Sequence, residues 1–546
     1  MALTSLPFAL FTIITALVYF VYPKKEQRWV ILLIASCFFY VYNSFQYSAF
    51  ILITIITVYL ASSGMTAISE ETRSVVKAKK AEWSREERKA YKEAADKKRR
   101  RILAGVLVLN FGILFILKYF NFLSGSIAAI IGASPDSAPQ IRLLLPLGIS
   151  FYTFIATGYL IDVYRETIEP ERNIFKFALF VSFFPHIIQG PISSFSKLRD
   201  QLIEPHDLEW LNFKHGIMLI CWGLFKKLVI ADRVWIAIKA YYSNGGIYGN
   251  DDFAGYSGTM VLFVTLLYAL QLYADFSGGI DISRGICRIL GIELEMNFRQ
   301  PYFSKSISEY WRRWHISLGG WLKNYLFYPL AMSNVFLNAS KKMKNTRFGK
   351  TAAGAHVSKV LPTSIASLIV FLVVGVWHGA DWKYVAFGIW NGGIIMLSIL
   401  MQPLFDGAVD KLHINRKNPV FIGFQIFRTL LVVLVGYVFD VVHDFGEGMY
   451  TFGQFFTGQN LPEGIAQIGT LGLLWQDYVV IGLGSIVLLV ASIIQEKHPE
   501  TDIRHMLDQK IFFVRALVLY IGVMAVVIFG IYGSGYNAAD FVYMQF

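Results

Sequence analysis

Cysteine is scarce in this sequence, which has three among 546 residues: Cys37, Cys221 and Cys287. They lie far apart, inside or beside apolar segments, and none stands in a CxxC or Cys/His spacing of the kind that binds zinc. The sequence therefore indicates no metal site, and we interpret the cysteines as packing residues. A nucleotide-binding P-loop is also missing, because Gly349-Lys350-Thr351 lacks the upstream glycine of that motif.

Charged residues are few as well, at 16 % of the chain against 55 % apolar residues. This composition is too apolar for a soluble protein of this length, so we predict an all-α, polytopic membrane protein. A helix that crosses the bilayer needs roughly 20 apolar residues, and about 11 to 13 transmembrane or re-entrant segments meet that condition. They lie near residues 5–22, 29–45, 47–64, 102–122, 142–162, 174–190, 214–231, 257–274, 363–379, 384–400, 419–439, 478–494 and 512–533.

Positive charge is absent from one long stretch: no Lys or Arg occurs from Thr429 to Glu496. Cytoplasmic loops of membrane proteins are enriched in these residues, which concentrate here at 73–101 and 341–359. We therefore predict that the basic loops face the cytoplasm, that loop 440–477 lies outside, and that both termini are extracytoplasmic. The net charge of +12 then reflects loop topology, and we exclude nucleic acid as a partner.

The spans and loops divide the chain into four predicted parts. N-terminal spans occupy 1–66, and a charged cytoplasmic loop occupies 67–101. A core follows at 102–400, and further spans with an extracytoplasmic tail complete the chain at 401–546. Because charges of both signs alternate with good helix formers in 67–101, we interpret this loop as a solvated helical hairpin; a patch that binds lipid headgroups is the alternative.

Polar residues inside membrane segments are costly and therefore mark candidate functional sites. His378 is the clearest one, at the end of an apolar run and flanked by Trp377. Gly375 and Gly379 permit close approach of backbones or a break in the helix. A neutral imidazole at this place can take a proton from a hydroxyl group, whereas the structural alternative is a histidine that hydrogen-bonds between helices.

A second histidine, His315, lies in the segment 304–325, which reads as one amphipathic helix. Its buried face carries Trp311, Trp314, His315, Leu318 and Leu322. Arg312 and Arg313 project elsewhere and could hold a phosphate of a donor such as coenzyme A. The alternative is an interfacial anchor whose histidine is hydrogen-bonded within the protein.

Two further clusters are candidates. Asp275 and Ser277 stand near the end of a span with Asp281, where carboxylates could orient a histidine or pair with Arg284; we favour pairing. His186 lies in 184–192, whose prolines and glycine suggest an unwound stretch that lines a cavity.

Six motifs together resemble the membrane-bound O-acyltransferase family, and within it the bacterial branch of alginate O-acetylation and teichoic-acid D-alanylation proteins. Each motif alone is unspecific, but the combination covers most of residues 140–400. The motifs are Phe183–Pro191, Gly223–Arg233, Asp275–Gly278, Asn297–Tyr302, Glu309–Leu318 and Trp377–Ala380.

The resemblance implies a ring of helices around a central funnel and no bound metal or cofactor. It places the family's near-invariant histidine at His378 and the branch's second histidine at His315, both catalytic. Substrate contacts would come from neighbouring motif residues. These are Trp311, Arg312, Arg313, Trp377, Asp275, Ser277 and Asn297.

The last six residues, 541–546, look like an ending found in the same branch, which implies that Tyr543 relays the acyl group. A tyrosine hydroxyl can be acylated by a thioester; an interfacial aromatic anchor is the alternative.

The function that the sequence predicts is transfer of an acyl group, acetyl by preference. It would pass from a cytoplasmic thioester, acetyl-CoA or an acyl-carrier protein, across the cell membrane to an extracytoplasmic cell-envelope polysaccharide, directly or through a secreted partner transferase. The basic segments 67–101 and 336–360 could dock a carrier protein. The alternatives are D-alanyl transfer from a carrier protein to teichoic acid and, from another class, a lipid-linked sugar flippase or transporter. The lack of a visible internal repeat weakens the transporter interpretation.

Overall fold

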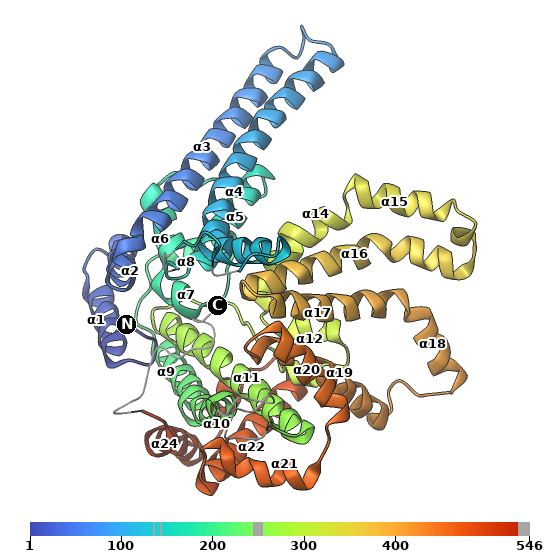
Figure 1. Cartoon of the computed structure of the whole chain (residues 1–546). Helices are drawn as coiled ribbons and strands as arrows, with labels where there is room; N and C mark the ends of the chain where they lie inside the picture. Colours follow the sequence, from blue (N-terminus) through green and yellow to red (C-terminus); the bar gives the residue numbers. More distant parts are fainter. Residues whose placement is uncertain (135–136, 142–144, 244–254, 533–546) are drawn as a thin grey trace. The chain divides into compact units, whose positions relative to one another are not determined.

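Helices build the protein (Figure 1). The computed structural model describes residues 1–134, 137–141, 145–243 and 255–532; it is 80 % helical, and none of the residues it describes forms a strand. The chain divides into two compact units, Met1–Gly216 with Ile286–Glu295, and Ile217–Gly285 with Met296–Phe546. The predicted all-α class is confirmed.

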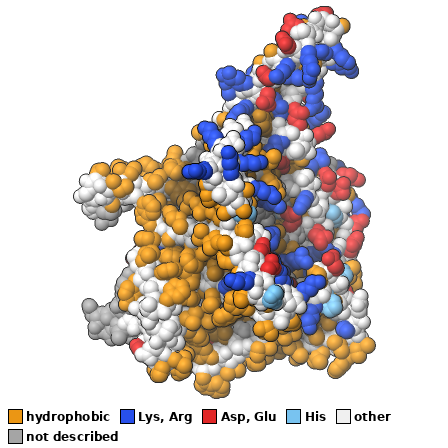
Figure 2. All heavy atoms as spheres, turned by 90° about the vertical axis from the view of Figure 1, so that its right-hand side faces the viewer, with side chains coloured by type: hydrophobic (Ala, Val, Ile, Leu, Met, Phe, Trp, Pro, Cys, Tyr) orange, Lys and Arg blue, Asp and Glu red, His pale blue; other side chains and the backbone are white. Residues whose placement is uncertain are grey.

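Eight helical segments among the described residues are long and apolar enough to cross a membrane. Their exposed faces are apolar: no residue of the hydrophobic window of Phe512–Phe529 is buried, and hydrophobic side chains cover much of the face seen in Figure 2. Because such surface is stable only against lipid, the predicted polytopic membrane protein is confirmed. The segments are Lys25–Ala78, Arg85–Ile130, Gly258–Ile289, Ala352–His378, Trp382–Leu400, Pro419–Val441, Trp475–Lys497 and Phe512–Phe529.

The first unit is organised around an aromatic cluster. Phe8, Phe11, Phe39 and Phe184 pack with ring centroids 5.0 to 6.4 Å apart, and this holds α1, α2 and α7 together. The prediction of an unwound stretch at 184–192 is wrong for its first six residues, because residues 184–189 form α7. The helices are α1 (Leu6–Val21), α2 (Arg28–Ser44), α3 (Ser48–Ala78), α4 (Arg85–Ile130), α5 (Ile149–Tyr164), α6 (Ile174–Ser182), α7 (Phe184–Gln189) and α8 (Phe195–Ile203).

The charged segment 67–101 forms the predicted helical hairpin, in which α3 and α4 run side by side and turn between Lys79 and Ser84 (Figure 1). Ser84 begins α4 with a capping box, since its hydroxyl accepts from the amide of Glu87 while the Glu87 carboxylate accepts from the amide of Ser84. At 1.5 Å per residue the 17 residues from Arg85 to Arg101 extend for about 25 Å. Lys and Arg side chains gather along this projection in Figure 2.

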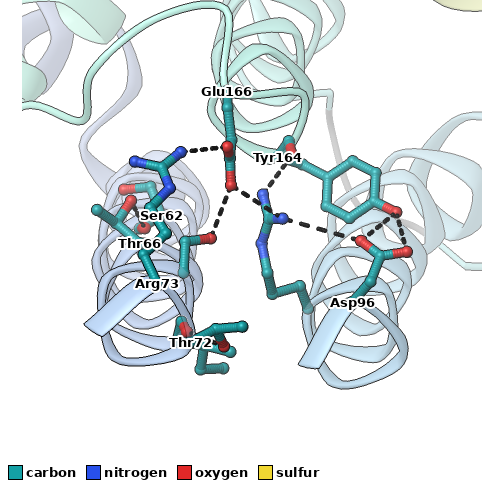
Figure 3. Close-up of polar contacts among 10 residues, drawn as sticks. Ser62, Thr66, Thr72, Arg73, Asp96, Tyr164 and Glu166 are labelled. Atoms are coloured by element: carbon teal, nitrogen blue, oxygen red, sulfur yellow. Dashed lines mark hydrogen bonds and ion pairs between the residues drawn. The ribbon is translucent and has the colours of Figure 1, made fainter. Parts of the chain in front are cut away.

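One carboxylate ties both arms of the hairpin to the end of α5 (Figure 3). Glu166 has a left-handed backbone (φ 57°), and its side chain accepts hydrogen bonds from Ser69 and Arg73 of α3. On the other arm, Nη1 of Arg99 lies 3.2 Å from Glu166 Oε1. The base of the hairpin is therefore fixed by ion pairs and hydrogen bonds.

We expect Glu166→Gln to weaken the attachment of the hairpin of α3 and α4 to the end of α5 at neutral pH. Burial raises the pKa of Glu166, but the hydrogen bonds from Ser69 and Arg73 and the charge of Arg99 outweigh burial, so the net pKa is lowered from 4.5. Because the pKa of Glu166 is lower in the folded state than in the unfolded state, its ionised carboxylate stabilises the fold at pH values above the unfolded-state pKa. This stabilisation is lost as the pH falls through the folded-state pKa. Hydrogen exchange of the peptides around Ser69 and Arg99 should be faster in E166Q at pH 7.

The wild type should lose the same protection only on acidification below about 4.5. The exposed Glu169, which lies nearby, provides the control: Glu169→Gln should exchange like the wild type. Equal protection in E166Q and wild type at both pH values would show that the carboxylate does not hold the hairpin.

The second unit contains the predicted amphipathic helix at 304–325, but that helix is interrupted. It ends at Arg313, and a new one begins at Ile316, so the prediction of one continuous helix is wrong. The first of the two helices begins after Ser306, whose hydroxyl accepts from the amide of Glu309. The helices are α10 (Asp232–Ser243), α11 (Gly258–Ile289), α12 (Ile307–Arg313), α13 (Ile316–Leu322), α14 (Tyr328–Ala331), α15 (Asn334–Lys344), α16 (Ala352–His378), α17 (Trp382–Leu400), α18 (Gln402–Lys411), α19 (Pro419–Val441), α20 (Phe445–Thr457), α21 (Leu461–Gln467), α22 (Trp475–Lys497), α23 (Ile503–Asp508) and α24 (Phe512–Phe529).

Two π-helical turns, Phe225–Ala231 and Lys323–Phe327, complete this unit, together with the end of α9 (Trp210–Leu224).

Helices α16 and α17 cross with their backbones in contact. A Cβ atom on Gly375 would lie 2.2 Å from the carbonyl oxygen of Tyr384, and one on Gly388 would lie 2.5 Å from that of Phe371. No side chain fits between the helices at these points. The close approach predicted for Gly375 is confirmed, and it fixes the end of α16, where His378 lies.

Candidate active site

His378 is the last residue of α16 and faces a carboxylate of α19. Its Nδ1 atom lies 3.5 Å from Oδ1 of Asp440. The imidazole packs between aromatic rings, with centroids 5.0 Å from Phe387 and 5.3 Å from Trp377. The side chain of His378 is 16 % exposed and that of Asp440 is 1 % exposed, so a partly accessible histidine is backed by a buried acid.

Tyr268 of α11 holds the other side of that acid. Its hydroxyl donates to Oδ2 of Asp440 at 2.8 Å, and both residues are buried. Neither Asp440 nor Tyr268 was predicted from the sequence, because Asp440 was expected at the start of the outer loop 440–477. In the structure Asp440 belongs to the last turn of α19, and a carboxylate at the edge of an apolar run was the available signal.

His315 occupies the break between α12 and α13 in a left-handed conformation, with φ 47° and ψ 54°. Such a backbone is rare for a residue with a side chain and costs about 1–3 kcal/mol. The stretch around Asn297 supports it, because the backbone carbonyl of Asn297 accepts from the amide of Ile316. His315 is held at this position by its neighbours at the expense of helical regularity.

The side chain of Asn297 fixes the tautomer of His315. Its Oδ1 accepts from both the amide and the hydroxyl of Ser317 at 2.9 Å and lies 3.3 Å from Nδ1 of His315. Since an amide N–H can only donate, Oδ1 is the acceptor of this cluster, and Nδ1 of His315 carries the proton. Burial first, and then the nearby charge of His378, lower the pKa of His315 to about 3, so this imidazole is neutral.

Trp377 brings the two histidines to one site. Its ring centroid lies 6.1 Å from that of His315 and 5.3 Å from that of His378. The structure thus brings together three predicted site residues, His315, Trp377 and His378. Asn297, a fourth, contacts Nδ1 of His315.

The predicted substrate contacts on α12 have protein partners. Nε1 of Trp311 donates to Asn391 of α17 at 3.1 Å. Arg313 forms ion pairs with Glu309 at 2.8 Å and with Glu496 at 2.7 Å, while Arg312 is exposed. Trp311 and Arg313 therefore brace α12 against α17 and α22, and Arg312 is the more accessible of the two cations that we expected to hold a phosphate.

Asp275 and Ser277 contact buried lysines of the π-helical turn 225–231. Lys227 lies 2.6 Å from Asp275 and 2.8 Å from Asp232, and Lys226 donates to Ser277 at 2.8 Å. Lys226 also pairs with Asp281 at 2.7 Å, and Asp281 lies 3.4 Å from Arg284. The favoured interpretation, pairing with Arg284, is therefore confirmed for Asp281. Asp275 forms its ion pair with Lys227 instead.

Two other candidates are not part of the group described so far. His186 is in the first unit, fully buried, with Nε2 3.0 Å from the hydroxyl of Ser193. Tyr543 lies outside the described residues.

Comparison with known proteins covers this site. The sequence profile described as the membrane-bound O-acyltransferase family matches residues 170–346 and 354–437, which include both His315 and His378. A second profile, of an uncharacterized membrane protein family, matches residues 3–196.

Relatives come from several bacteria. A probable alginate O-acetylase of Pseudomonas syringae pv. tomato is 34 % identical over 362 residues, which cover 65 % of this chain and 61 % of the relative. Its counterpart in Pseudomonas aeruginosa is 31 % identical over 397 residues, 70 % of this chain and 67 % of the relative. A peptidoglycan O-acetyltransferase of Helicobacter pylori is 30 % identical over 334 residues, 56 % of each chain. The chain spans about three fifths of the length of the first of these relatives.

Proposed function

The chain belongs to the membrane-bound O-acyltransferase family, and we propose that it moves an acetyl group from a cytoplasmic thioester to a hydroxyl group of a cell-envelope polysaccharide. The observation that carries this proposal is the pair of neighbouring histidines in a membrane protein, one of them facing a buried carboxylate. A transporter or flippase would not require His378 as the proton acceptor of a chemical step.

In the proposed reaction His378 acts as the general base. Its Nε2 atom, on the side of the ring away from Asp440, takes the proton of the acceptor hydroxyl. The hydroxyl oxygen attacks the thioester carbonyl, and the carbon–sulfur bond of the tetrahedral intermediate then breaks. The imidazolium returns its proton to the departing thiolate, so the products are an ester and a free thiol.

His315 has a different part in this scheme. Because its proton is on Nδ1, its Nε2 atom can only accept a hydrogen bond. Burial lowers the pKa of His315 to about 3, so this neutral imidazole is a poor base for the acceptor hydroxyl. We therefore assign proton transfer to His378, with His315 lining the same site beside Trp377.

Charge supports the proposed direction of transfer. Basic residues concentrate in the hairpin of α3 and α4 and in the region around α15, at 73–101 and 341–359, which is typical of the cytoplasmic side. An acidic donor, either acetyl-CoA or an acylated carrier protein, would be attracted to that side. The hydroxyl acceptor would then come from the opposite side, either a polysaccharide directly or a secreted partner transferase, and the termini would be extracytoplasmic.

The tail adds a relay to the proposal. With the C-terminus outside, the phenol of Tyr543 could accept the acyl group from the thioester and pass it to the glycan. D-alanyl transfer to teichoic acid is the second candidate, and it differs in donor and acceptor but uses the same two histidines.

One experiment tests the proposal and separates the donors. The purified protein in lipid nanodiscs is given heavy-isotope acetyl-CoA or a D-alanyl carrier protein, and mass spectrometry follows free thiol, acylated acceptor and acylated tail peptide. Release of thiol with acetyl transfer supports the proposal, and transfer only from the D-alanyl carrier supports the second candidate. No transfer from either thioester would overturn both.

A further inference from the structure

The two histidines of the site face acceptors of different charge. Nδ1 of His315 faces the neutral amide of Asn297, whereas Nδ1 of His378 faces the carboxylate of Asp440. An acceptor at Nδ1 selects the tautomer with its proton there and leaves Nε2 basic, but only a carboxylate also stabilises the positive charge that appears when Nε2 takes a proton.

We propose that Asp440, held in place by Tyr268, is the positioning residue that sets the tautomer of His378 and supports its positive charge during catalysis. This inference rests on the proposed acyl transfer and adds the residues that make His378, and not His315, the base.

The environment of Asp440 supports this role. A carboxylate in an apolar membrane helix is expensive unless donors surround it. Oδ2 has the Tyr268 hydroxyl at 2.8 Å. Oδ1 is buried and has no hydrogen-bond donor within bonding distance among the residues described, while His378 Nδ1 faces it at 3.5 Å. Catalytic hydrogen bonds are often this long without substrate and shorten in the reactive complex.

Lys383 is the cation near this acid, and its ammonium group has a different partner. Nζ of Lys383 donates to the backbone carbonyl of Val442 at 2.5 Å. The ammonium group of Lys383 therefore does not take the place of the imidazole at Oδ1 of Asp440.

The phenol of Tyr268 is held rigidly enough to aim the acid. Its ring packs edge-on against Tyr437, with centroids 5.7 Å apart, and Tyr437 lies one turn before Asp440 on α19. The hydroxyl of Tyr437 is in turn hydrogen-bonded to that of Tyr310. Tyr268 therefore contributes one hydrogen bond whose removal leaves the packing in place.

The test compares Asp440→Asn and Tyr268→Phe with the wild type. Asp440→Asn keeps the shape of the side chain but removes the charge and presents a mixed donor and acceptor. We expect kcat to fall about 10²- to 10⁴-fold, the range seen when a histidine loses its orienting carboxylate, with KM changed less than about threefold because neither residue binds substrate. Tyr268→Phe should lower kcat about tenfold.

Tyr302→Phe is the matched control. It also removes one phenol, whose hydroxyl donates to the carbonyl of Ala269 at 2.6 Å and lies 3.5 Å from that of Tyr437, but it keeps the hydrogen bond from Tyr268 to Asp440, so kcat should stay within about threefold of the wild type. Size-exclusion profiles show whether each variant is folded. If Asp440→Asn does not fold, the kcat of Tyr268→Phe still tests the proposed role of Asp440.

A second measurement needs no acyl donor. Diethyl pyrocarbonate modifies the basic nitrogen of neutral imidazoles, and mass spectrometry reads each histidine separately. Modification of His378 should slow several-fold in Asp440→Asn, while that of the exposed His498 stays constant. Wild-type kcat and wild-type modification of His378 in Asp440→Asn would overturn the inference. If the wild type transfers no acyl group at all, the proposed function fails, and the modification rates alone decide the role of Asp440.

Discussion

Replacement of His378 by alanine is expected to lower kcat for acyl transfer about 10²- to 10⁴-fold, the usual contribution of a general base. The imidazole is the group that faces a buried carboxylate and remains partly accessible, so the acceptor hydroxyl has no equivalent base without it. KM for the thioester should change little, because the loss affects the transition state and not donor binding. Steady-state rates of thiol release with acetyl-CoA measure both constants.

His498→Ala supplies the comparison for this prediction, since His498 is an exposed histidine of the same unit. Its activity should equal that of the wild type. If His378→Ala retained more than about a tenth of wild-type kcat, proton transfer would belong to another group, and His315 would be the next residue to replace.

Lys227→Met is expected to destabilise the fold more than any surface substitution, by about 3–5 kcal/mol in free energy of unfolding. The ammonium group of Lys227 lies between the carboxylates of Asp275 and Asp232, at 2.6 and 2.8 Å, and all three side chains are at least nine-tenths buried. Removal of the cation takes away the ammonium group that lies between two buried acids. Thermal unfolding in detergent, followed by tryptophan fluorescence, measures the loss.

The triple variant Lys227→Met, Asp275→Asn, Asp232→Asn makes this prediction specific. It removes the acids together with the lysine, so most of the lost stability should return. Lys359→Met, at an exposed position of α16, should unfold like the wild type. If Lys227→Met alone were as stable as the wild type, the ion pairs of Lys227 with Asp275 and Asp232 would contribute nothing to folding.

Local patterns made the spans, the hairpin and the place of His378 predictable. The hydrophobic runs matched the long helices closely, because burial in lipid is decided by composition over some 20 residues. The hairpin followed from alternating charges and helix formers, and the approach of α17 followed from Gly375. Each of these depends on residues that are neighbours in the sequence.

Contacts between distant residues were not predictable in the same way. The break at His315 depends on Asn297, and the helical period of 304–325 gave no sign of it. Asp440 and Tyr268 are 172 positions apart. No local pattern distinguishes Tyr268 from the other tyrosines among the 29 of the chain, so this contact could not be predicted. The lysines of the π-helical turn were visible as part of a motif, but their pairing with Asp275 and Asp232 appears only when the helices pack.

The crossing of α16 and α17 decides which part of the reaction has to move. With glycine backbones in contact at Gly375 and Gly388, no side chain can change rotamer to let one helix slide past the other, so the imidazole at the end of α16 stays at a fixed depth in the protein. In the proposed reaction the thioester carbonyl must therefore come to that depth. The length of the acyl chain is then limited by the space beyond the imidazole of His378. Movement of this base would not make room for a longer chain.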